Sequence, residues 1–244
     1  MKNNIQIHAL IPARSGSKGI KNKNIVKINN KELIGYTIEL AKKIKLINKI
    51  IVSTDSKKIK KIAEKFGATV PFLRPKKFSK DNSTDLDVFK HYLFWLNKKK
   101  QENPALIVHL RVTTPFRNIK KINEAIKIML NHKNASCLRS FKKSNFSPYK
   151  MWEYRDKFRV RPVIQSNNKL EAHSIARQNL PQTFNHIGVV DILRPEKTIL
   201  KNSICGNEVV PLIFDKKDLK NYIDIDTKDD LNRAKLLIKN KKKI

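Results

Sequence analysis

The sequence predicts an α/β fold with a mostly parallel sheet and helices on both faces. Short apolar runs alternate along the chain with segments whose apolar residues recur at helical spacing. The runs carry few polar residues, as expected for strands that are buried on both faces. The chain has 244 residues, of which 40% are hydrophobic, so it suits one large domain or one domain with an insertion.

The first 131 residues follow a β-α order that favours parallel strand pairing. The apolar runs predict strands over 5–11, 49–54, 69–73 and 105–110. Helical spacing predicts helices over 32–45, 56–67, 83–99 and 118–131. Gly67 ends one of these helices, and Ser83 is the expected N-cap of the next.

The pattern changes after about residue 140. The segment 142–185 alternates apolar and charged residues and then becomes polar, so we predict an inserted flap or dimerisation arm there. Residues 1–141 and 186–244 then form the main domain. In the second part, strands are predicted over 186–194, 208–214 and 221–226, and a closing helix over 227–240 begins after Thr227.

The composition is strongly basic, with a net charge of +32 from 53 Lys and Arg against 21 Asp and Glu. A non-enzymatic polyanion-binding protein is one interpretation. We favour compositional bias instead, because the lysines are spread over every helix and no nucleic-acid-binding motif occurs, so no specific nucleic-acid partner is expected. Two distant cysteines and the lack of an apolar run of about 20 residues favour a cytoplasmic protein without a membrane partner.

A small cationic loop, IPARSGSKGIKNKN, follows the first predicted strand. Ligands of open α/β sheets bind beyond the carboxyl ends of the strands. Glycine allows the backbone to approach a phosphate closely, and Arg and Lys neutralise its charge. The loop therefore predicts a cradle for a triphosphate, although a solvated basic turn is the plainer alternative. The candidate residues are Arg14, Ser17, Lys18, Gly19, Lys23 and Asn24.

Near the other end of the chain, YIDIDTKDD places Asp224 and Asp226 two residues apart. In a strand, this spacing puts both carboxylates on one face. Two neighbouring carboxylates repel each other unless a cation lies between them, and Mg²⁺ is commonly held by one or two carboxylates together with substrate phosphates. The pair predicts a Mg²⁺ site, while helix capping by Asp226 would explain only one of the two residues.

Two further segments carry cationic candidates. HLRVTTPFRN brings Arg111 and Arg117 to a strand end, an arrangement that suits anion binding, although Arg117 could simply flank the next helix. ARQNLPQTF places Arg177 and Gln178 in the predicted insertion.

Taken together, these motifs, with IIVSTDS and VPFLRP, stand in the order found in acylneuraminate cytidylyltransferases, the CMP-sialic acid synthetases, which the chain resembles over nearly its whole length. The resemblance implies a Rossmann-like nucleotidyltransferase fold, the substrates CTP and a sugar acid, Mg²⁺, and a homodimer whose inserted arm reaches the partner's site. It assigns the CTP loop to Arg14, Ser17, Lys18, Lys23 and Asn24, nucleotide binding to Arg74, the metal to Asp224 and Asp226, and the sugar-acid side to Arg177 and Gln178.

Two departures from the family pattern fall on the sugar-acid side. Arg111 stands where the family motif LLQPTSPLR has glutamine. In IGVVD, Ile187 and Asp191 replace the asparagine and tyrosine of NGAIY. The resemblance therefore implies an intact nucleotide half and an altered acceptor half, with Arg111 against the acceptor.

We expect a Mg²⁺-dependent enzyme that transfers CMP from CTP to the anomeric hydroxyl of a 3-deoxy-2-keto sugar acid and releases pyrophosphate. Arg14 and Lys23 would stabilise the leaving pyrophosphate, and Asp224 and Asp226 would hold the metal. Another ulosonate or a phosphonate is the alternative acceptor. A sugar-1-phosphate nucleotidyltransferase would instead want a GGxGTR-type loop, which ARSGSKG does not match.

Overall fold

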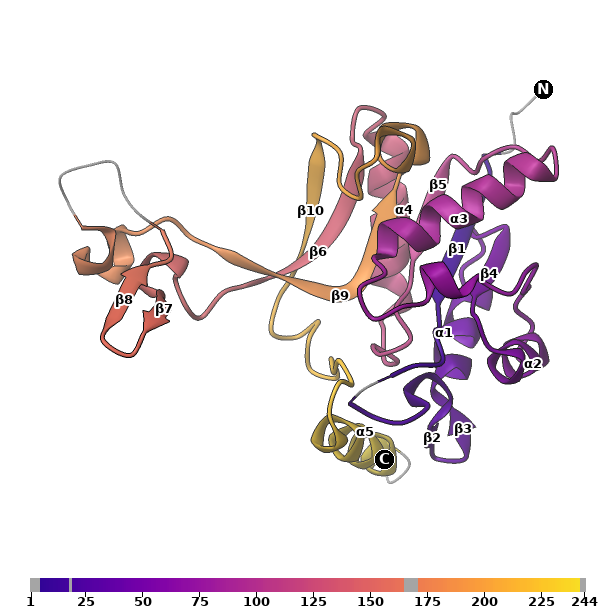
Figure 1. Cartoon of the computed structure of the whole chain (residues 1–244), viewed down its shortest axis with the longest axis horizontal. Helices are drawn as coiled ribbons and strands as arrows, with labels where there is room; N and C mark the ends of the chain where they lie inside the picture. Colours follow the sequence, from indigo (N-terminus) through magenta and orange to yellow (C-terminus); the bar gives the residue numbers. More distant parts are fainter. Residues whose placement is uncertain (1–4, 18, 165–170, 242–244) are drawn as a thin grey trace.

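The computed structural model describes residues 5–17, 19–164 and 171–241, and its centre is a six-stranded sheet in the order β10-β6-β9-β5-β1-β4 (Figure 1). Strand β9 runs antiparallel to both of its neighbours, and the other neighbouring strands are parallel. The predicted α/β class with a mostly parallel sheet is therefore confirmed. The strands are β1 Ile7–Pro12, β4 Lys49–Ser53, β5 Leu106–His109, β6 Cys137–Lys143, β9 Phe184–Leu193 and β10 Val209–Phe214.

Helices cover both faces of the sheet. Because successive side chains of a strand point to opposite faces, Ala9 and Ile11 of β1 join one buried cluster while Leu10 joins the other. Leu10 packs in the cluster that contains α3, and the opposite cluster contains α1, α2, α4 and α5. The helices are α1 Leu33–Lys42, α2 Lys57–Lys65, α3 Asp85–Lys98, α4 Ile119–Asn131 and α5 Lys228–Lys241.

Three predicted details are wrong. Residues 69–73 make only two isolated bridges to the chain at β4, because Pro71 cannot donate a hydrogen bond to a ladder. Residues 221–226 are irregular and form no strand. The N-cap of α3 is Thr84, whose side chain accepts a hydrogen bond from the backbone of Asp87 while Asp87 bonds back to Thr84, so Ser83 lies one residue outside.

Shorter elements connect the main ones. Strands β2 (Lys27–Ile28) and β3 (Lys31–Glu32) form a small antiparallel hairpin that the sequence pattern did not indicate, and α5 lies against β2. The short 3-10 helices are η1 Lys23–Ile25, η2 Lys76–Phe78, η3 Pro148–Lys150, η4 Ala172–Ser174, η5 Arg177–Asn179, η6 Pro195–Lys197 and η7 Ile199–Lys201.

Between β6 and β9 the chain leaves the sheet and forms a projecting arm, which we define as the described residues from 144 to 183 (orange at the left of Figure 1). Its main feature is the antiparallel hairpin of β7 (Trp152–Asp156) and β8 (Arg159–Pro162). The ends of β6 and β9, which pair as far as Lys143 with Phe184, connect the arm to the sheet.

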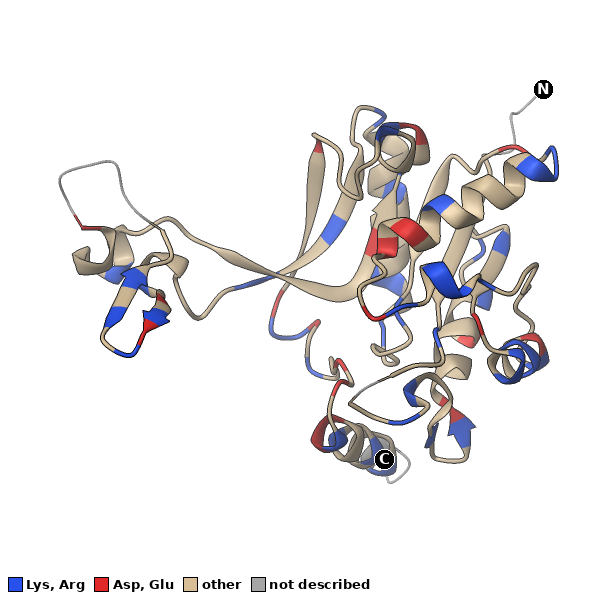
Figure 2. Ribbon diagram, viewed as in Figure 1, with Lys and Arg blue, Asp and Glu red and all other residues tan. Residues whose placement is uncertain are grey.

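Lys and Arg residues are distributed over the helices, the loops and the arm and do not form a single stripe along the ribbon (Figure 2). This distribution agrees with a compositional origin of the charge. In the described part of the chain, no helix is both long enough and apolar enough to cross a bilayer.

Candidate active site

A cavity of about 490 Å³ opens beyond the carboxyl ends of β1 and β5. This is the edge where open α/β sheets bind their ligands. Candidate residues from distant parts of the sequence meet here, and the structure brings together Arg14, Ser17, Gly19, Lys23, Asn24, Arg74, Arg111 and Asp226. Lys18 belongs to the same predicted set but lies outside the described residues.

Hydrogen bonds hold the loop after β1, some within the loop itself and some to Asp55, which follows the neighbouring strand β4. The carboxylate of Asp55, just beyond β4, accepts bonds of 2.8 and 2.7 Å from the backbone and hydroxyl of Ser15. The buried Asn24 donates to the carbonyl of Arg14 at 2.8 Å. Arg14 itself pairs with Asp81 at 2.6 Å. The loop therefore presents its cationic side chains from a fixed backbone.

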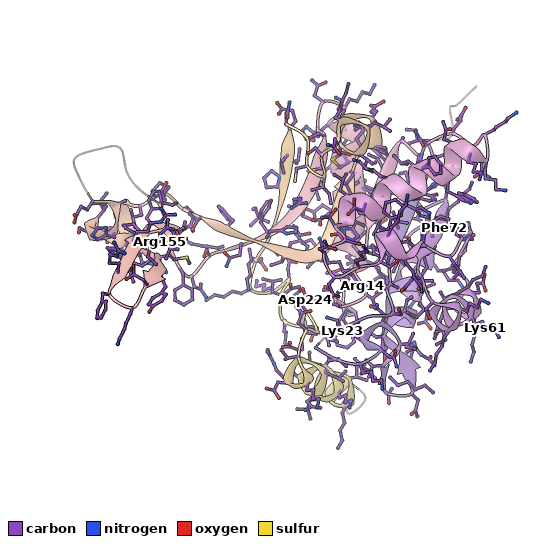
Figure 3. All side chains as sticks on the ribbon, in the orientation of Figure 1. Arg14, Lys23, Lys61, Phe72, Arg155 and Asp224 are labelled. Carbon is purple, nitrogen blue, oxygen red and sulfur yellow. The ribbon has the colours of Figure 1, made fainter. Side chains whose placement is uncertain are left out.

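The two ends of the chain meet at the cavity. Lys23 Nζ lies 2.7 Å from Asp226 Oδ1, and the backbone amide of Ile225 donates to the carbonyl of Thr113 at 2.9 Å. A Cβ at Gly19 would lie only 2.5 Å from the carbonyl oxygen of Asp226, so glycine permits this close approach. Figure 3 shows Arg14, Lys23 and Asp224 in this central region.

Asp224 and Asp226 face different surroundings, contrary to the strand-based expectation of one shared face. Asp226 is exposed beside Lys23, whereas Asp224 Oδ1 is buried without a hydrogen-bond partner among the described residues. Helix capping does not account for Asp226, because Thr227 and Asp230 form the reciprocal hydrogen bonds at the start of α5. Asp224 does not line the cavity that Asp226 lines, but a buried carboxylate oxygen without a hydrogen-bond partner among the described residues fits a hard cation that takes its other ligands from substrate and water.

Two carboxylates are too few for a metal cage made by protein alone. Within the described ranges there is no group of three or more His, Cys, Asp or Glu side chains that could hold an ion. This donor set fits Mg²⁺ better than Zn²⁺, because structural zinc sites need four protein ligands and catalytic ones usually three.

Arg74 also lines the cavity. Its side chain is buried, its Nε donates to Ser79 Oγ at 3.1 Å, and burial lowers the pKa of its guanidinium. The N-terminus of α3 lies on the same wall, with Ser83, Thr84 and Asp85 among the lining residues. The sequence predicted the start of this helix at Ser83, one residue early, but not that it lines the cavity.

Arg111 and Arg117 do not form a free anion-binding pair. Arg117 is buried, and its guanidinium donates to the carbonyls of Val189 and Arg111. Burial lowers the pKa of Arg117 to about 9. Its role is therefore to hold backbone, and only Arg111 lines the cavity.

Arg111 is engaged by two carboxylates. It donates to Asp191 at 2.9 Å and to Asp85 at 3.3 Å. Burial opposes its charge, but the two carboxylates outweigh burial and raise the pKa of Arg111. Burial also opposes ionisation of Asp191, yet the hydrogen bond with His186 and the charge of Arg111 hold the pKa of Asp191 well below its usual range.

Arg177 and Gln178 lie in η5 on the arm, away from this cavity. They line a separate hollow of about 570 Å³ with Lys143 and Ser144, and Arg177 donates to the carbonyl of Asn145. Figure 3 labels Arg155 on the same arm, far from Arg14 and Lys23. A single copy of the chain does not bring Arg177 or Gln178 to the nucleotide cavity.

A cationic loop after the first strand of an α/β sheet, facing carboxylates from a later segment, defines a nucleotide-binding transferase. The comparison with family models makes this specific. Residues 8–179 match the model described as cytidylyltransferase, so the chain belongs to the cytidylyltransferase family of nucleotidyltransferase enzymes.

Individual relatives agree with this family. Post-translational flagellin modification protein B of Campylobacter coli is 28% identical over 97% of this chain and 96% of that protein. N-acylneuraminate cytidylyltransferase of Escherichia coli O18:K1:H7 is 39% identical over 57% of this chain, and the match spans only 32% of that longer protein. The solved structure of CMP:2-keto-3-deoxy-manno-octonic acid synthetase complexed with CTP covers 97% of this chain and 99% of its own, with a TM-score of 0.67 at 13% identity.

Proposed function

We propose that this enzyme transfers CMP from CTP to the anomeric hydroxyl of a 3-deoxy-2-keto sugar acid and releases pyrophosphate, with Mg²⁺ as cofactor. The observation that carries this proposal is the meeting of Lys23 and Asp226 at 2.7 Å across the mouth of one cavity. A cation-rich loop beside a carboxylate at one cavity is the arrangement that a magnesium nucleotide would need, and this supports the proposal. The names of relatives that act on N-acylneuraminate and 2-keto-3-deoxy-manno-octonic acid support a sugar acid as acceptor.

In this proposal, the cationic residues bind and orient the triphosphate. Arg14, Lys23 and Arg74 line the cavity and would bind the phosphates, and Gly19 adds exposed backbone at the same cavity. As the acceptor hydroxyl attacks the α-phosphorus in line, negative charge accumulates on the leaving pyrophosphate. Arg14 and Lys23 stabilise that charge, which is the main contribution that a protein makes to such transfers.

Asp224 and Asp226 would hold Mg²⁺. When bound, the ion neutralises phosphate charge and lowers the pKa of a coordinated hydroxyl. The buried, unpartnered oxygen of Asp224 is the feature that this role explains. Without a cation, an uncompensated carboxylate oxygen in a buried place is costly.

Arg111 would contact the acceptor, while the loop after β1 would bind the triphosphate in the same cavity. We also infer that the enzyme acts as a homodimer in which Arg177 and Gln178 of the arm meet the acceptor of the partner subunit. The supporting observation is the arm itself, which carries exposed Phe146, Tyr154 and Phe158 and holds Arg177 outside its own nucleotide cavity. Such an apolar surface on a projecting segment is typical of a subunit interface.

The test is product analysis with purified enzyme, CTP, Mg²⁺ and a panel of acceptors. The panel contains N-acetylneuraminate, 3-deoxy-manno-octulosonate, a further 2-keto sugar acid and a phosphonate. The proposal predicts pyrophosphate release and a CMP conjugate with at least one sugar acid. Conjugate formation with the phosphonate alone, or hydrolysis of CTP without transfer, would contradict it.

A further inference from the structure

Arg111 lies between two carboxylates at the edge of the candidate active site. Its Nη1 is 2.9 Å from Asp191 Oδ2, and its Nη2 is 3.3 Å from Asp85 Oδ2. A guanidinium that bonds two separate carboxylates through two different nitrogens has little freedom to rotate. Its remaining N–H groups are therefore held in one orientation, and its side chain lines the cavity.

Asp191 is the buried member of this arrangement. It is 3% exposed, and its second oxygen lies 2.9 Å from His186 Nε2. It stands in β9 directly across from His109 of β5, and no described residue hydrogen-bonds either ring nitrogen of His109. Without Arg111, Asp191 would be a buried carboxylate beside two histidines, His186 at 2.9 Å and His109 at 3.8 Å, with no permanently charged ion-pair partner among the described residues, which is an unfavourable state.

The side chain of Arg111 lies near another candidate residue, Asp224. Gly188 of β9 lies against the stem of Arg111, and a Cβ there would be 3.3 Å from Arg111 Cδ, 3.4 Å from Thr114 Oγ1 and 3.5 Å from Asp224 Oδ2. Arg111, which lines the cavity, therefore also lies near Asp224, where the proposed function puts the attacking acceptor.

The charge balance around Arg111 limits what it can bind. One positive charge is shared between two carboxylates, so the group carries no spare positive charge for an anion. It still offers oriented N–H donors. These N–H groups of Arg111 suit a neutral hydrogen-bond acceptor of the substrate, such as a hydroxyl or an acylamino carbonyl, better than a substrate carboxylate.

The two positions are also among the three at which the sequence departs from the acylneuraminate pattern, with Arg111 in place of glutamine and Asp191 in place of tyrosine. The structure shows that these departures touch each other. Either change alone would leave an ionised group poorly compensated, whereas the two together form a pair.

We propose that Asp191 is a positioning residue that holds Arg111 in place, and that the Arg111–Asp191 pair acts as one specificity-determining unit for a neutral polar group of the acceptor. This inference rests on the proposed function. Arg111 lines the same cavity as the triphosphate loop, but its ion pairs among the described residues are to Asp191 and Asp85, so we expect a larger effect on the acceptor than on CTP.

The experiment is a double-mutant cycle with Arg111→Gln, Asp191→Asn and the double variant. KM values for CTP and for the preferred sugar acid of the wild-type panel are measured separately. Each single variant should raise the acceptor KM about tenfold, as is usual for members of one ion-pair network, and the double variant should raise it about tenfold as well. The KM for CTP should change much less, by about twofold or less in all three, because the ion pairs of Arg111 among the described residues do not involve the triphosphate loop.

Arg111→Lys separates charge from geometry. It keeps the positive charge but loses the rigid fork of donors, so we expect an increase in acceptor KM as large as that of Arg111→Gln. Arg194→Gln is the matched control, since Arg194 is another partly buried arginine that bonds the carbonyls of Ala135 and Met129 and does not line the cavity. It should lower the melting temperature without changing either KM.

Several results would overturn the inference. One is an unchanged acceptor KM in Asp191→Asn, and another is a wild-type acceptor KM in Arg111→Lys. A third is an increase of about a hundredfold in the double variant, because two independent tenfold effects multiply to that value. If the Asp191 variant does not fold, Asp85→Asn tests the same positioning from the exposed side, and an unchanged acceptor KM there also contradicts it. A wild-type enzyme that turns over no sugar acid contradicts the proposed function itself, which distinguishes the two failures.

Discussion

The cavity at the sheet edge and the projecting arm differ in how their functional side chains are supported. At the cavity, partners from distant parts of one chain hold each other, as in Lys23 with Asp226 and Arg14 with Asp81. On the arm, Phe158 is 86% exposed and Phe146 73% exposed. A single chain is enough to build the nucleotide site, whereas the arm presents apolar surface that a second molecule would cover.

The largest expected effect concerns Asp226, which lines the cavity, and Asp224, which the proposed function assigns to the same metal ion. Asp226→Ala and Asp224→Asn should each lower the rate of pyrophosphate release by about 10²–10³-fold, the usual loss when one electrostatic contribution to a transition state is removed. Asp229→Asn is the control, because Asp229 is an exposed acid in the first turn of α5 that does not line the cavity. Steady-state turnover with CTP and Mg²⁺ measures both, and wild-type turnover in Asp226→Ala would remove the carboxylate pair from the mechanism.

The arm provides the next largest effect. If Arg177 acts in the partner's site, mixing inactive Asp226→Ala with inactive Arg177→Ala after subunit exchange should restore activity to about a quarter of wild type, because half of the dimers are hybrids with one intact site. Each variant exchanged against itself is the control. No recovery in the mixture, with hybrids verified by mass spectrometry, would place Arg177 in its own subunit's site or outside the reaction.

Contact between the chain ends can be weakened at Gly19. A Cβ there would lie 2.5 Å from the carbonyl oxygen of Asp226, which is backbone and cannot easily move. Gly19→Ala should therefore raise the KM for CTP by about tenfold, because the loop has to shift away from its binding geometry. Gly16→Ala is the control, since its Cβ would meet nothing within 4 Å. Equal KM values for the two variants would show that this approach is not needed for CTP binding.

The last effect concerns the stability of the fold and its pH dependence, with no change in activity expected at neutral pH. Burial, the dominant cause for both residues, lowers the pKa of His8 and of His109 to about 4 in the folded state, below the 6.5 of an exposed imidazole. The unfolded chain then takes up these protons first, so stability is intact above pH 6.5 and falls as pH drops toward 4, by up to about 3 kcal/mol per histidine.

His109→Leu tests this pH dependence. Neither ring nitrogen of His109 has a hydrogen-bond partner among the described residues, so the substitution removes the titrating imidazole and its 3.8 Å contact with Asp191 but no hydrogen bond. Denaturant unfolding at pH 7.5, 5.5 and 4.5 should show a shallower loss of stability for the variant than for the wild type. Parallel pH profiles would mean that the imidazole does not titrate in this range.

Local sequence signals predicted the fold and the part of the site that the loop after β1 contributes. Apolar runs located the buried strands, and the position of Arg14, Lys23 and Asn24 directly after β1 was enough to place them at the ligand-binding edge. The encounter of Asp226 with Lys23 depended on a resemblance, because pairing across 203 positions leaves no periodic pattern in the sequence.

Other parts of the site could not be derived in this way. The pairing of Arg111 with Asp191 arises only when β5 and β9 lie next to each other in antiparallel register. The irregular path of 221–226 follows from its contacts with the loop at Thr113 and not from its strand-like composition. The direction of the arm is likewise a property of the assembled sheet.

The central claim is that the two ends of the chain form one site for a magnesium nucleotide. Thermal unfolding with each of the four NTPs and Mg²⁺, in wild type and in Lys23→Ala, tests it most directly. The account predicts selective stabilisation of the wild type by CTP, about 2.7 kcal/mol at 100 times Kd, and its loss in Lys23→Ala. Equal stabilisation by all four NTPs that disappears with added salt would contradict it and favour a general polyanion-binding surface.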